Sequence, residues 1–430
     1  MKGTPTSWLM WGIPALLFLI GFFHRVSPGV MAKDLMQAFE ASGKIVGLLS
    51  AMYFYAYAGL MIPGGVLLDA WGARRVIAGG SAVMAAGTLV MGAAEAQGTL
   101  FLGRFLVGAG ATVTFTGALT IAAAWFPPGR FGTMSAITAT VGVLGSLVAT
   151  APLAWLMAAV GWRRAMVAVG AATLVGAALC AWLVRDRPPG REETPGSGPR
   201  LRPVIRGMAT VLANRHTWPP FLAFFCLNVG TANLMLWVVP YLSDVYGMTT
   251  AEAALYATAM ATALLVTGPL TGYLSDRVLR RRKLPFTVLT GCSAVLWLVF
   301  VLTLGALPPW RVYLLFFAMG VVGGSFVLTW PVGREVNPPH LAGVAVAVAN
   351  LGGFLGAALS QAPFGAVLDA RWVGVMADGA RVYPLEAYRL AFGICAGFVL
   401  AGCLATLLIR ETRGRNIHHE LYPAREPAQG

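Results

Sequence analysis

The sequence predicts an all-α membrane protein with twelve transmembrane helices, arranged as two parallel pseudo-repeats of six helices each. The first observation behind this prediction is the composition. Of the 430 residues, 57% are hydrophobic and only 11% are charged, whereas a soluble domain carries about 25% charged residues. The apolar runs are long enough to cross a bilayer as helices, and they lack the alternation of membrane β-strands.

Twelve apolar runs are expected to be the spans. They cover residues 8–30, 45–68, 75–96, 99–124, 131–158, 163–185, 218–242, 250–273, 285–306, 310–332, 342–366 and 387–410. The first run is interpreted as a retained helix rather than a cleaved signal, since no convincing cleavage site follows it. All five cysteines lie inside runs, so we expect packing roles rather than disulfides or a metal site. No cofactor is expected.

An internal repeat is the second observation. GGVLLDAWGARR (64–75) aligns residue for residue with TGYLSDRVLRRR (271–282). The repeat predicts two six-helix halves at 1–185 and 217–412, with a linker at 186–216 and a tail at 413–430. The linker is rich in proline, glycine and charge. Parallel halves are a recurring plan of secondary transporters.

The basic excess is explained by membrane topology. The net charge is +14, which in a soluble protein would suggest a nucleic-acid partner. If the N-terminus is cytoplasmic, most of the 31 Lys and Arg residues fall at inner helix ends, inner loops and tails. This bias follows the positive-inside rule. It predicts cytoplasmic N- and C-termini in the cell inner membrane, a lipid bilayer as surroundings and no nucleic acid as partner.

With these features the sequence resembles the major facilitator superfamily over essentially its whole length. Residues 64–75 resemble the superfamily signature G-x-L-x-D-R-x-G-R-[KR], with departures at Ala70, where arginine is usual, and at Ala73. The second copy keeps an Asp-Arg pair and a basic run. The resemblance implies a bacterial secondary transporter that works by alternating access, with a monomer sufficient for function.

The repeated motif predicts a gate. Gly65 and Gly272 are expected where a helix passes close to a neighbour. Asp69 and Asp276, at cytoplasmic helix ends, can accept hydrogen bonds from a facing helix N-terminus or pair with arginine. The resemblance implies that such contacts between the halves close the cytoplasmic side; the alternative is that the charges only anchor a tight loop. The gating candidates are Gly65, Asp69, Gly72, Arg74, Arg75, Gly272, Asp276, Arg277 and Arg281.

Charges inside the spans point to a substrate site. Such a charge costs roughly 2.5–3.5 kcal/mol on insertion scales, which makes it a functional candidate. No span carries Asp or Glu near its centre, whereas Arg25 and Arg104 lie within spans. Arg25 either faces a cavity and binds an anionic group or extends to the outer headgroups, because Ser27, Pro28 and Gly29 suggest that the helix breaks there.

Three residues are candidates for coupling. His24 is either a protonation switch or, as we expect more readily, an interfacial histidine. Arg104 stands in R-x-x-x-G-x-G, which resembles the superfamily's fourth-helix motif, associated in relatives with proton coupling; its alternative is a pair with outer loops or Glu95. Asp34 is the weak carboxylate candidate for exchange of a proton or another ion.

Neutral polar groups complete the expected cavity. Tyr53 and Tyr57 are four residues apart and therefore share one helix face. A buried amide finds its partner in another helix as easily as in a substrate. The substrate-binding candidates are Arg25, Tyr53, Tyr57, Asn228, Asn233, Trp237, Asn350 and Gln361.

These residues favour transport of a small organic anion. The alternative is proton-coupled efflux of lipophilic or cationic drugs, which needs a buried carboxylate and usually a helix-five glycine pattern whose spacing GVLGSLVATAPL (142–153) does not keep. An enzyme is not expected, because the sequence lacks H-E-x-x-H and Walker-type motifs and any soluble catalytic insert.

Overall fold

The computed structural model describes residues 4–127, 130–189 and 201–422. Eleven of its helices are long and apolar enough to cross a membrane, and one bent pair makes a twelfth span. The helices of the first half are α1 (Pro5–Phe39), α2 (Gly43–Trp71), α3 (Ala73–Gly92), α4 (Gln97–Trp125), α5 (Phe131–Val148), α6 (Ala151–Val160) and α7 (Trp162–Leu183). The α-helices that follow are α8 (Leu201–Ala213), α9 (Trp218–Tyr246), α10 (Thr250–Tyr273), α11 (Lys283–Leu302), α12 (Pro309–Gly323), α13 (Thr329–Glu335), α14 (Ala342–Ala370) and α15 (Leu385–Leu407).

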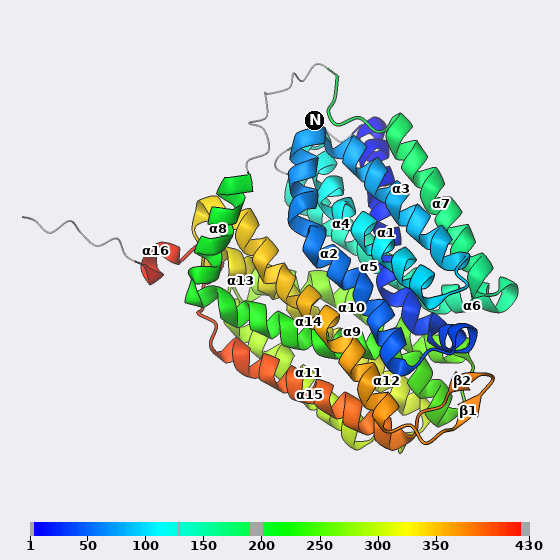
Figure 1. The fold of residues 1–430 in the computed structure, drawn as a ribbon. Coiled ribbons are helices and arrows are strands. Elements are labelled where there is room, and N and C mark those ends of the chain that lie inside the picture. Colours follow the sequence, from blue (N-terminus) through cyan, green and yellow to red (C-terminus); the bar gives the residue numbers. More distant parts are fainter. Residues whose placement is uncertain (1–3, 128–129, 190–200, 423–430) are drawn as a thin grey trace, which may run out of the picture.

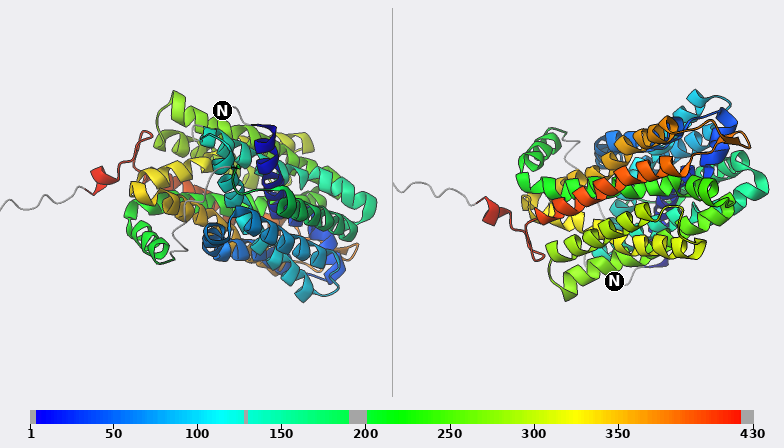
Figure 2. Two further views of the ribbon diagram at one scale, coloured as in Figure 1. Left: turned by 90° about the horizontal axis from the view of Figure 1, so that it is seen from above. Right: turned by 90° about the horizontal axis from the view of Figure 1, so that it is seen from below.

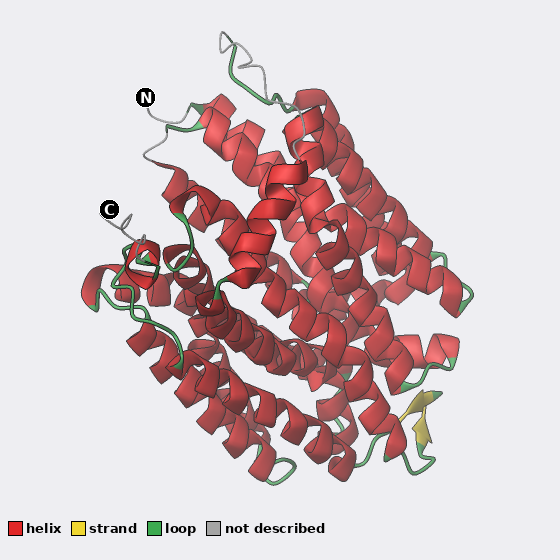
Figure 3. Ribbon diagram, turned by 60° about the vertical axis from the view of Figure 1, so that its left-hand side comes forward, coloured by secondary structure: helices red, strands yellow, loops and turns green. Residues whose placement is uncertain are grey.

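The helices form two bundles, α1–α7 and α9–α15 (Figures 1 and 2). A small hairpin of β1 (Met376–Ala377) and β2 (Ala380–Arg381) lies at one end of the molecule (Figure 3). We call this end the hairpin end. The opposite end, which holds α8 and the first turn of α1, is the linker end (Figure 1). The prediction of an all-α bundle of two six-helix halves is confirmed.

The first helix is longer than the sequence predicted. Pro28 was expected to end it near residue 30, but α1 continues to Phe39. Residues 26–32 are all buried, so packing outweighs the hydrogen bond that Pro28 cannot donate. Gly29 permits a close approach: a Cβ there would lie 2.3 Å from the carbonyl oxygen of Met235 in the other half.

The fifth span is broken rather than continuous. Its two segments, α5 and α6, meet at a bend of 41°. Pro152 has no N–H to donate to the carbonyl one turn earlier, which interrupts the helix. Thr258 of α10 stabilises the break, because its hydroxyl lies 2.9 Å from that of Thr150 and 3.4 Å from the backbone N–H of Ala151.

The linker and the tail contain structure that the sequence did not indicate. Helix α8 lies inside the predicted linker and buries Val211 against Phe221 and Ala345 at the starts of α9 and α14. The tail forms α16 (His418–Leu421), and Ile417 N–H donates to the carbonyl of Glu335 at 2.8 Å. Helix α8 is amphipathic rather than apolar throughout, so it does not stand out as an apolar run, and α16 has only four residues.

The two halves meet most closely toward the hairpin end. There α2 and α14 run side by side (Figure 1), and glycines bring their backbones together. A Cβ at Gly47 would lie 2.1 Å from the carbonyl oxygen of Gln361, and one at Gly365 would lie 2.0 Å from that of Gly43. The hydrogen bonds between the described parts of the two halves lie on this side of the molecule.

Candidate substrate site and gates

Arg25 lies between the two halves. It lies well inside α1, which does not break beside it. The alternative that Arg25 extends to the outer headgroups assumed such a break and therefore loses its support. Its Nε donates to the Tyr53 hydroxyl at 3.3 Å. Its guanidinium carbon lies 3.9 Å from the centre of the Phe22 ring and 4.9 Å from that of Phe354 in the second half. No described carboxylate forms an ion pair with Arg25.

Tyr53 and Tyr57 share one face of α2, as predicted, with ring centres 5.9 Å apart. The Tyr53 hydroxyl accepts from Arg25 and donates to the carbonyl of Gly21 at 3.0 Å. The Tyr57 ring stacks on Phe354 at 4.4 Å with an interplanar angle of 6°. Phe354 was not among the predicted site residues, because a phenylalanine within an apolar run does not stand out in the sequence.

Arg104 is fully buried and has no hydrogen-bond partner for any guanidinium nitrogen among the described residues. Arg104 lies on α4, and its guanidinium carbon is 5.0 Å from the centre of the Tyr53 ring on α2. Glu95 is exposed, so the alternative of a pair with it is wrong in this structure. Tyr53 therefore contacts two arginines, Arg25 and Arg104.

His24 is not an interfacial residue. It is fully buried, and its Nε2 lies 3.0 Å from the Thr88 hydroxyl of α3, while Nδ1 has no partner among the described residues. The expectation of an interfacial histidine fails because α1 passes through the bundle at this point instead of ending. Asp34 is half-buried near the hairpin end of α1.

The predicted amides mostly serve the second half itself. Asn228 donates to the carbonyl of Gly353 at 2.5 Å, and Asn233 donates to Ser360 at 2.8 Å, so both tie α9 to α14. Asn350 accepts from the Trp330 indole at 3.1 Å. Gln361 is buried and its side-chain oxygen has no described partner. These contacts fit the structural interpretation of the amides.

Trp237 belongs to the closed hairpin end. It is fully buried and its ring stacks on Phe364 at 5.7 Å. A Cβ at Gly43 of α2 would lie 3.2 Å from the indole. Trp237 therefore lies at the contact between halves, and none of its surface is available to an interfacial belt.

A set of polar contacts, which we call the hairpin latch, joins the halves. Lys33 of α1 forms an ion pair with Asp244 of α9 at 2.5 Å and donates to the carbonyl of Arg381 at 2.6 Å. The Asp244 side chain is only 3% exposed. It also accepts from the Tyr388 hydroxyl at 2.8 Å, so its charge is satisfied from both halves.

Asp369 is the second carboxylate of the hairpin latch. It accepts from the backbone N–H groups of Gly43 and Lys44 at 2.9 and 2.8 Å, which are the first residues of α2. The helix dipole favours a negative charge at this position. Arg381 and the Tyr383 hydroxyl donate to the same carboxylate at 3.0 and 2.7 Å. Burial and this hydrogen bond raise the pKa of Tyr383, so it stays a neutral donor.

The first copy of the repeated motif makes contacts within its own half. Arg74 N–H donates to Asp186 at 2.6 Å, and its Nε donates to the carbonyl of Ala181 at 2.8 Å. Asp69 and Arg75 are exposed, and neither forms a side-chain hydrogen bond or ion pair with another described residue. The gating role of this motif stays a prediction.

Gly72 and Gly65 of this motif are expected to differ in their tolerance to alanine. Gly72 has φ +81° and ψ 153°, and a Cβ would lie 2.8 Å from Asp186. Gly72→Ala should therefore lower the free energy of unfolding by about 1–3 kcal/mol. Gly65→Ala meets nothing within 4 Å and should not lower the melting temperature. Thermal unfolding in detergent measures the stability of both variants. An equal loss of stability in the two would contradict the prediction that only Gly72 is restricted to glycine.

The second copy also makes its contacts within its own half. Asp276 pairs with Arg282, whose guanidinium also contacts Glu335 at 3.1 Å. Arg282 was not among the predicted gating residues, whereas the predicted Arg277 and Arg281 are exposed. Glu335 was missed because it lies at the end of α13, outside the predicted span.

The close helix approach predicted at Gly65 and Gly272 is absent from this conformation. Nothing lies within 4 Å of a Cβ placed at either glycine. The reason is that the hydrogen bonds between the described parts of the two halves lie toward the other end of the molecule. The structure is thus closed at the hairpin end, with no described hydrogen bond between the halves at the linker end.

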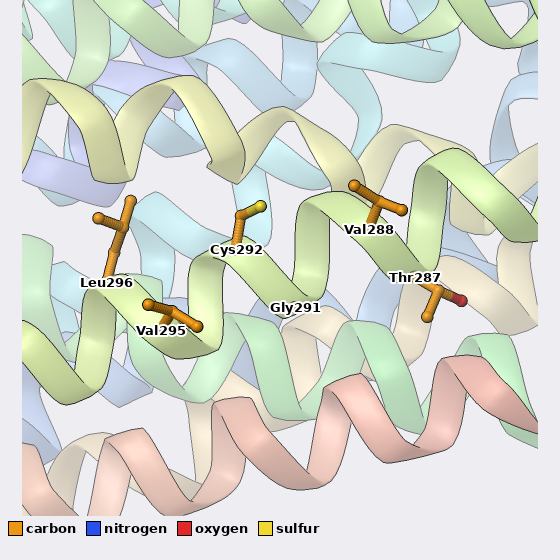
Figure 4. Close-up of a pocket in the computed structure, with 6 residues that line it drawn as sticks. All are labelled: Thr287, Val288, Gly291, Cys292, Val295 and Leu296. Carbon is orange, nitrogen blue, oxygen red and sulfur yellow. The ribbon is translucent and has the colours of Figure 1, made fainter.

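A groove of about 510 Å³ on α11 is not the candidate site. Thr287, Val288, Gly291, Cys292, Val295 and Leu296 line it. Figure 4 shows these residues along a single helix, α11. The lining is apolar and lacks any charged group that would select an anion.

Comparison with known proteins gives relatives that are transporters. The chain is 24% identical to a probable sulfoacetate transporter of Cupriavidus necator over 94% of both chains. It is 25% identical to a probable galactarate/D-glucarate transporter of Escherichia coli, covering 82% of this chain and 86% of that one. Among solved structures, a bacterial homologue of the human lysosomal transporter Spinster superposes with a TM-score of 0.78 at 17% identity, covering 96% of this chain and 98% of that one.

The family model of the Major Facilitator Superfamily matches residues 15–361. This match covers more than half of the chain and includes the repeated motif and both central arginines. The protein is therefore a multi-pass membrane transporter that belongs to the Major Facilitator Superfamily.

Proposed function

We propose that this transporter carries a small organic anion with two acidic groups across the cell inner membrane by alternating access, as a monomer. The observation that carries the proposal is Arg25, a charge between the halves that no described carboxylate neutralises. A guanidinium binds carboxylates and sulfonates through paired hydrogen bonds. The relatives' named substrates, sulfoacetate, galactarate and D-glucarate, are organic acids of this kind.

Arg25 is the proposed anion-binding residue, and Tyr53 and Tyr57 form the wall of the site beside it. Arg104 is the proposed second charge. Its guanidinium carbon lies 5.0 Å from the centre of the Tyr53 ring, and no described residue accepts a hydrogen bond from it. His24 and Asp34 remain the proposed candidates for a coupling proton or another ion.

The hairpin end is proposed to face the outside and the linker end the cytoplasm. The positive-inside rule supports this orientation, because the basic residues of α8, of the two motif loops and of the described part of the tail lie at the linker end. The structure then has its outer side closed. Asp69 and Asp276 are proposed to close the opposite side in the alternate state.

The drug-efflux alternative lacks support. An exporter of cations needs a carboxylate within the membrane. The carboxylates of the described spanning helices all lie in the first or last two turns of their spans: Asp34, Asp69, Asp244, Glu252, Asp276, Glu335, Asp369 and Glu386. The relatives named above carry organic acids.

A ligand panel tests the proposal. The purified protein is heated with sulfoacetate, galactarate, a neutral sugar, an amino acid and tetraphenylphosphonium, each over a concentration series. A ligand that binds only the folded state raises the melting temperature with concentration. Stabilisation by a dianion alone is the expected result. Stabilisation by the lipophilic cation but by no acid would overturn the proposal.

A further inference from the structure

We propose that Phe354, which the second half contributes, is a positioning residue that completes the anion site around Arg25. The site is then fully formed only while the hairpin end is closed. This inference rests on the proposed function, because it assigns the anion to Arg25.

Aromatic rings from both halves surround the Arg25 guanidinium. The guanidinium carbon lies 3.9 Å from the ring centre of Phe22 and 5.1 Å from that of Tyr57, both in the first half. Phe354 of α14 lies at 4.9 Å and stacks on Tyr57 at 4.4 Å. The ring of Phe354 therefore closes a cage whose other walls belong to the opposite half.

The cage fixes the guanidinium before a ligand arrives. Arginine stacks on aromatic faces while its in-plane N–H groups remain able to bind an oxyanion. Tyr53 holds Nε at 3.3 Å and is itself fixed by its hydrogen bond to the carbonyl of Gly21. A side chain that is already ordered loses less conformational entropy on binding, so the anion binds more tightly.

The contact between Phe354 and the cage depends on the state of the transporter. Phe354 reaches Tyr57 because α2 and α14 lie against each other, with Gly47 of α2 in contact with the backbone of Gln361, two turns along α14 from Phe354. When the hairpin end opens, these two helices must separate. The cage then loses the wall that Phe354 provides, and Arg25 becomes free to change its orientation. The affinity for the anion is accordingly higher in the conformation seen here.

Phe354→Leu tests the inference, because leucine keeps an apolar side chain and removes the ring. We expect the Kd of the acid that stabilises the wild type, sulfoacetate or galactarate, to rise about 2- to 30-fold, the range of a cation–π contact. Phe354→Tyr restores the ring and should restore the Kd. Titration calorimetry in nanodiscs measures each value, and the melting temperature without ligand shows that each variant is folded.

The matched control is Phe316→Leu on α12. Phe316 is buried and packs against Phe300 within the second half, with ring centres 5.3 Å apart. Its loss should leave the Kd within about 2-fold of the wild type, since Arg25 and the contact between α2 and α14 are untouched. A wild-type Kd in Phe354→Leu, or an equal loss in Phe316→Leu, would overturn the inference.

Anion binding by the wild type, Arg25→Gln and Phe354→Leu distinguishes a failure of this inference from a failure of the proposed function. If an acid binds the wild type, fails to bind Arg25→Gln and binds Phe354→Leu normally, only the inference falls. If no organic acid binds the wild type, the proposed function falls and the inference falls with it.

Discussion

Replacement of Arg25 by glutamine is expected to weaken binding of the organic anion roughly 10- to 100-fold, which is the loss of a charge-assisted pair of hydrogen bonds. The side chain has no described carboxylate partner, so its removal leaves no unpaired acid behind. The unfolding temperature without ligand should therefore change little. Calorimetric titration with the acid that stabilises the wild type measures the loss.

Arg163→Gln is the matched control for this experiment. Arg163 also lies over an aromatic ring, at 4.4 Å from Trp162, and donates to the carbonyl of Ala94, but all of these contacts belong to the first half. Its removal should leave the affinity unchanged. An equal loss of affinity in both variants would mean that positive charge in general, and not Arg25, attracts the anion.

Replacement of Asp369 by asparagine should open the hairpin end. The carboxylate accepts from two N–H groups of α2, from the Tyr383 hydroxyl and from Arg381. An amide removes the ion pair and turns a donor toward one of these donors. We expect a cost of about 2–3 kcal/mol to the closed state, which corresponds to a change of about 30- to 150-fold in the equilibrium between closed and open.

Single-molecule fluorescence measures this equilibrium. Dyes on Glu95→Cys and Arg311→Cys report the separation of the two halves, because both positions are exposed and lie in different halves. The exposed Cys292 is first replaced by serine. Asp369→Asn should move the population to longer distances.

Asp186→Asn controls for a general effect of losing a carboxylate at a helix start. Asp186 accepts from the first turn of α3 at 2.6 Å, within one half and at the linker end. Asp186→Asn should leave the distribution of distances between the two dyes unchanged. An unchanged distribution in Asp369→Asn as well would show that the hairpin latch does not hold the halves together.

The fold was predictable because membrane helices need long apolar runs and internal repeats survive in sequence. The errors lie where packing outweighs local preference. Ser27, Pro28 and Gly29 suggested the end of a helix, yet Gly29 lets α1 contact the other half. Pro152 breaks the fifth span within an otherwise apolar run, and only the contact with Thr258 shows where the break is stabilised.

The sequence predicted the charged residues of the candidate site better than its apolar residues. Arg25 and Arg104 are conspicuous because charges inside apolar runs are rare. Phe354 is one phenylalanine among 22, and nothing in its neighbourhood distinguishes it before folding brings it to Tyr57. The hairpin latch was missed for a related reason. Asp244 and Asp369 lie just beyond the predicted spans, where carboxylates are ordinary, and their partners come from the opposite half.

Counterflow in proteoliposomes tests directly whether the protein transports an organic acid that Arg25 binds. Vesicles that contain the protein are loaded with unlabelled sulfoacetate or galactarate and then diluted into a trace of the same labelled acid. We expect the label to accumulate with the wild-type protein and not to accumulate with Arg25→Gln. Undiminished counterflow in Arg25→Gln, or exchange of tetraphenylphosphonium without exchange of either acid, would contradict this expectation.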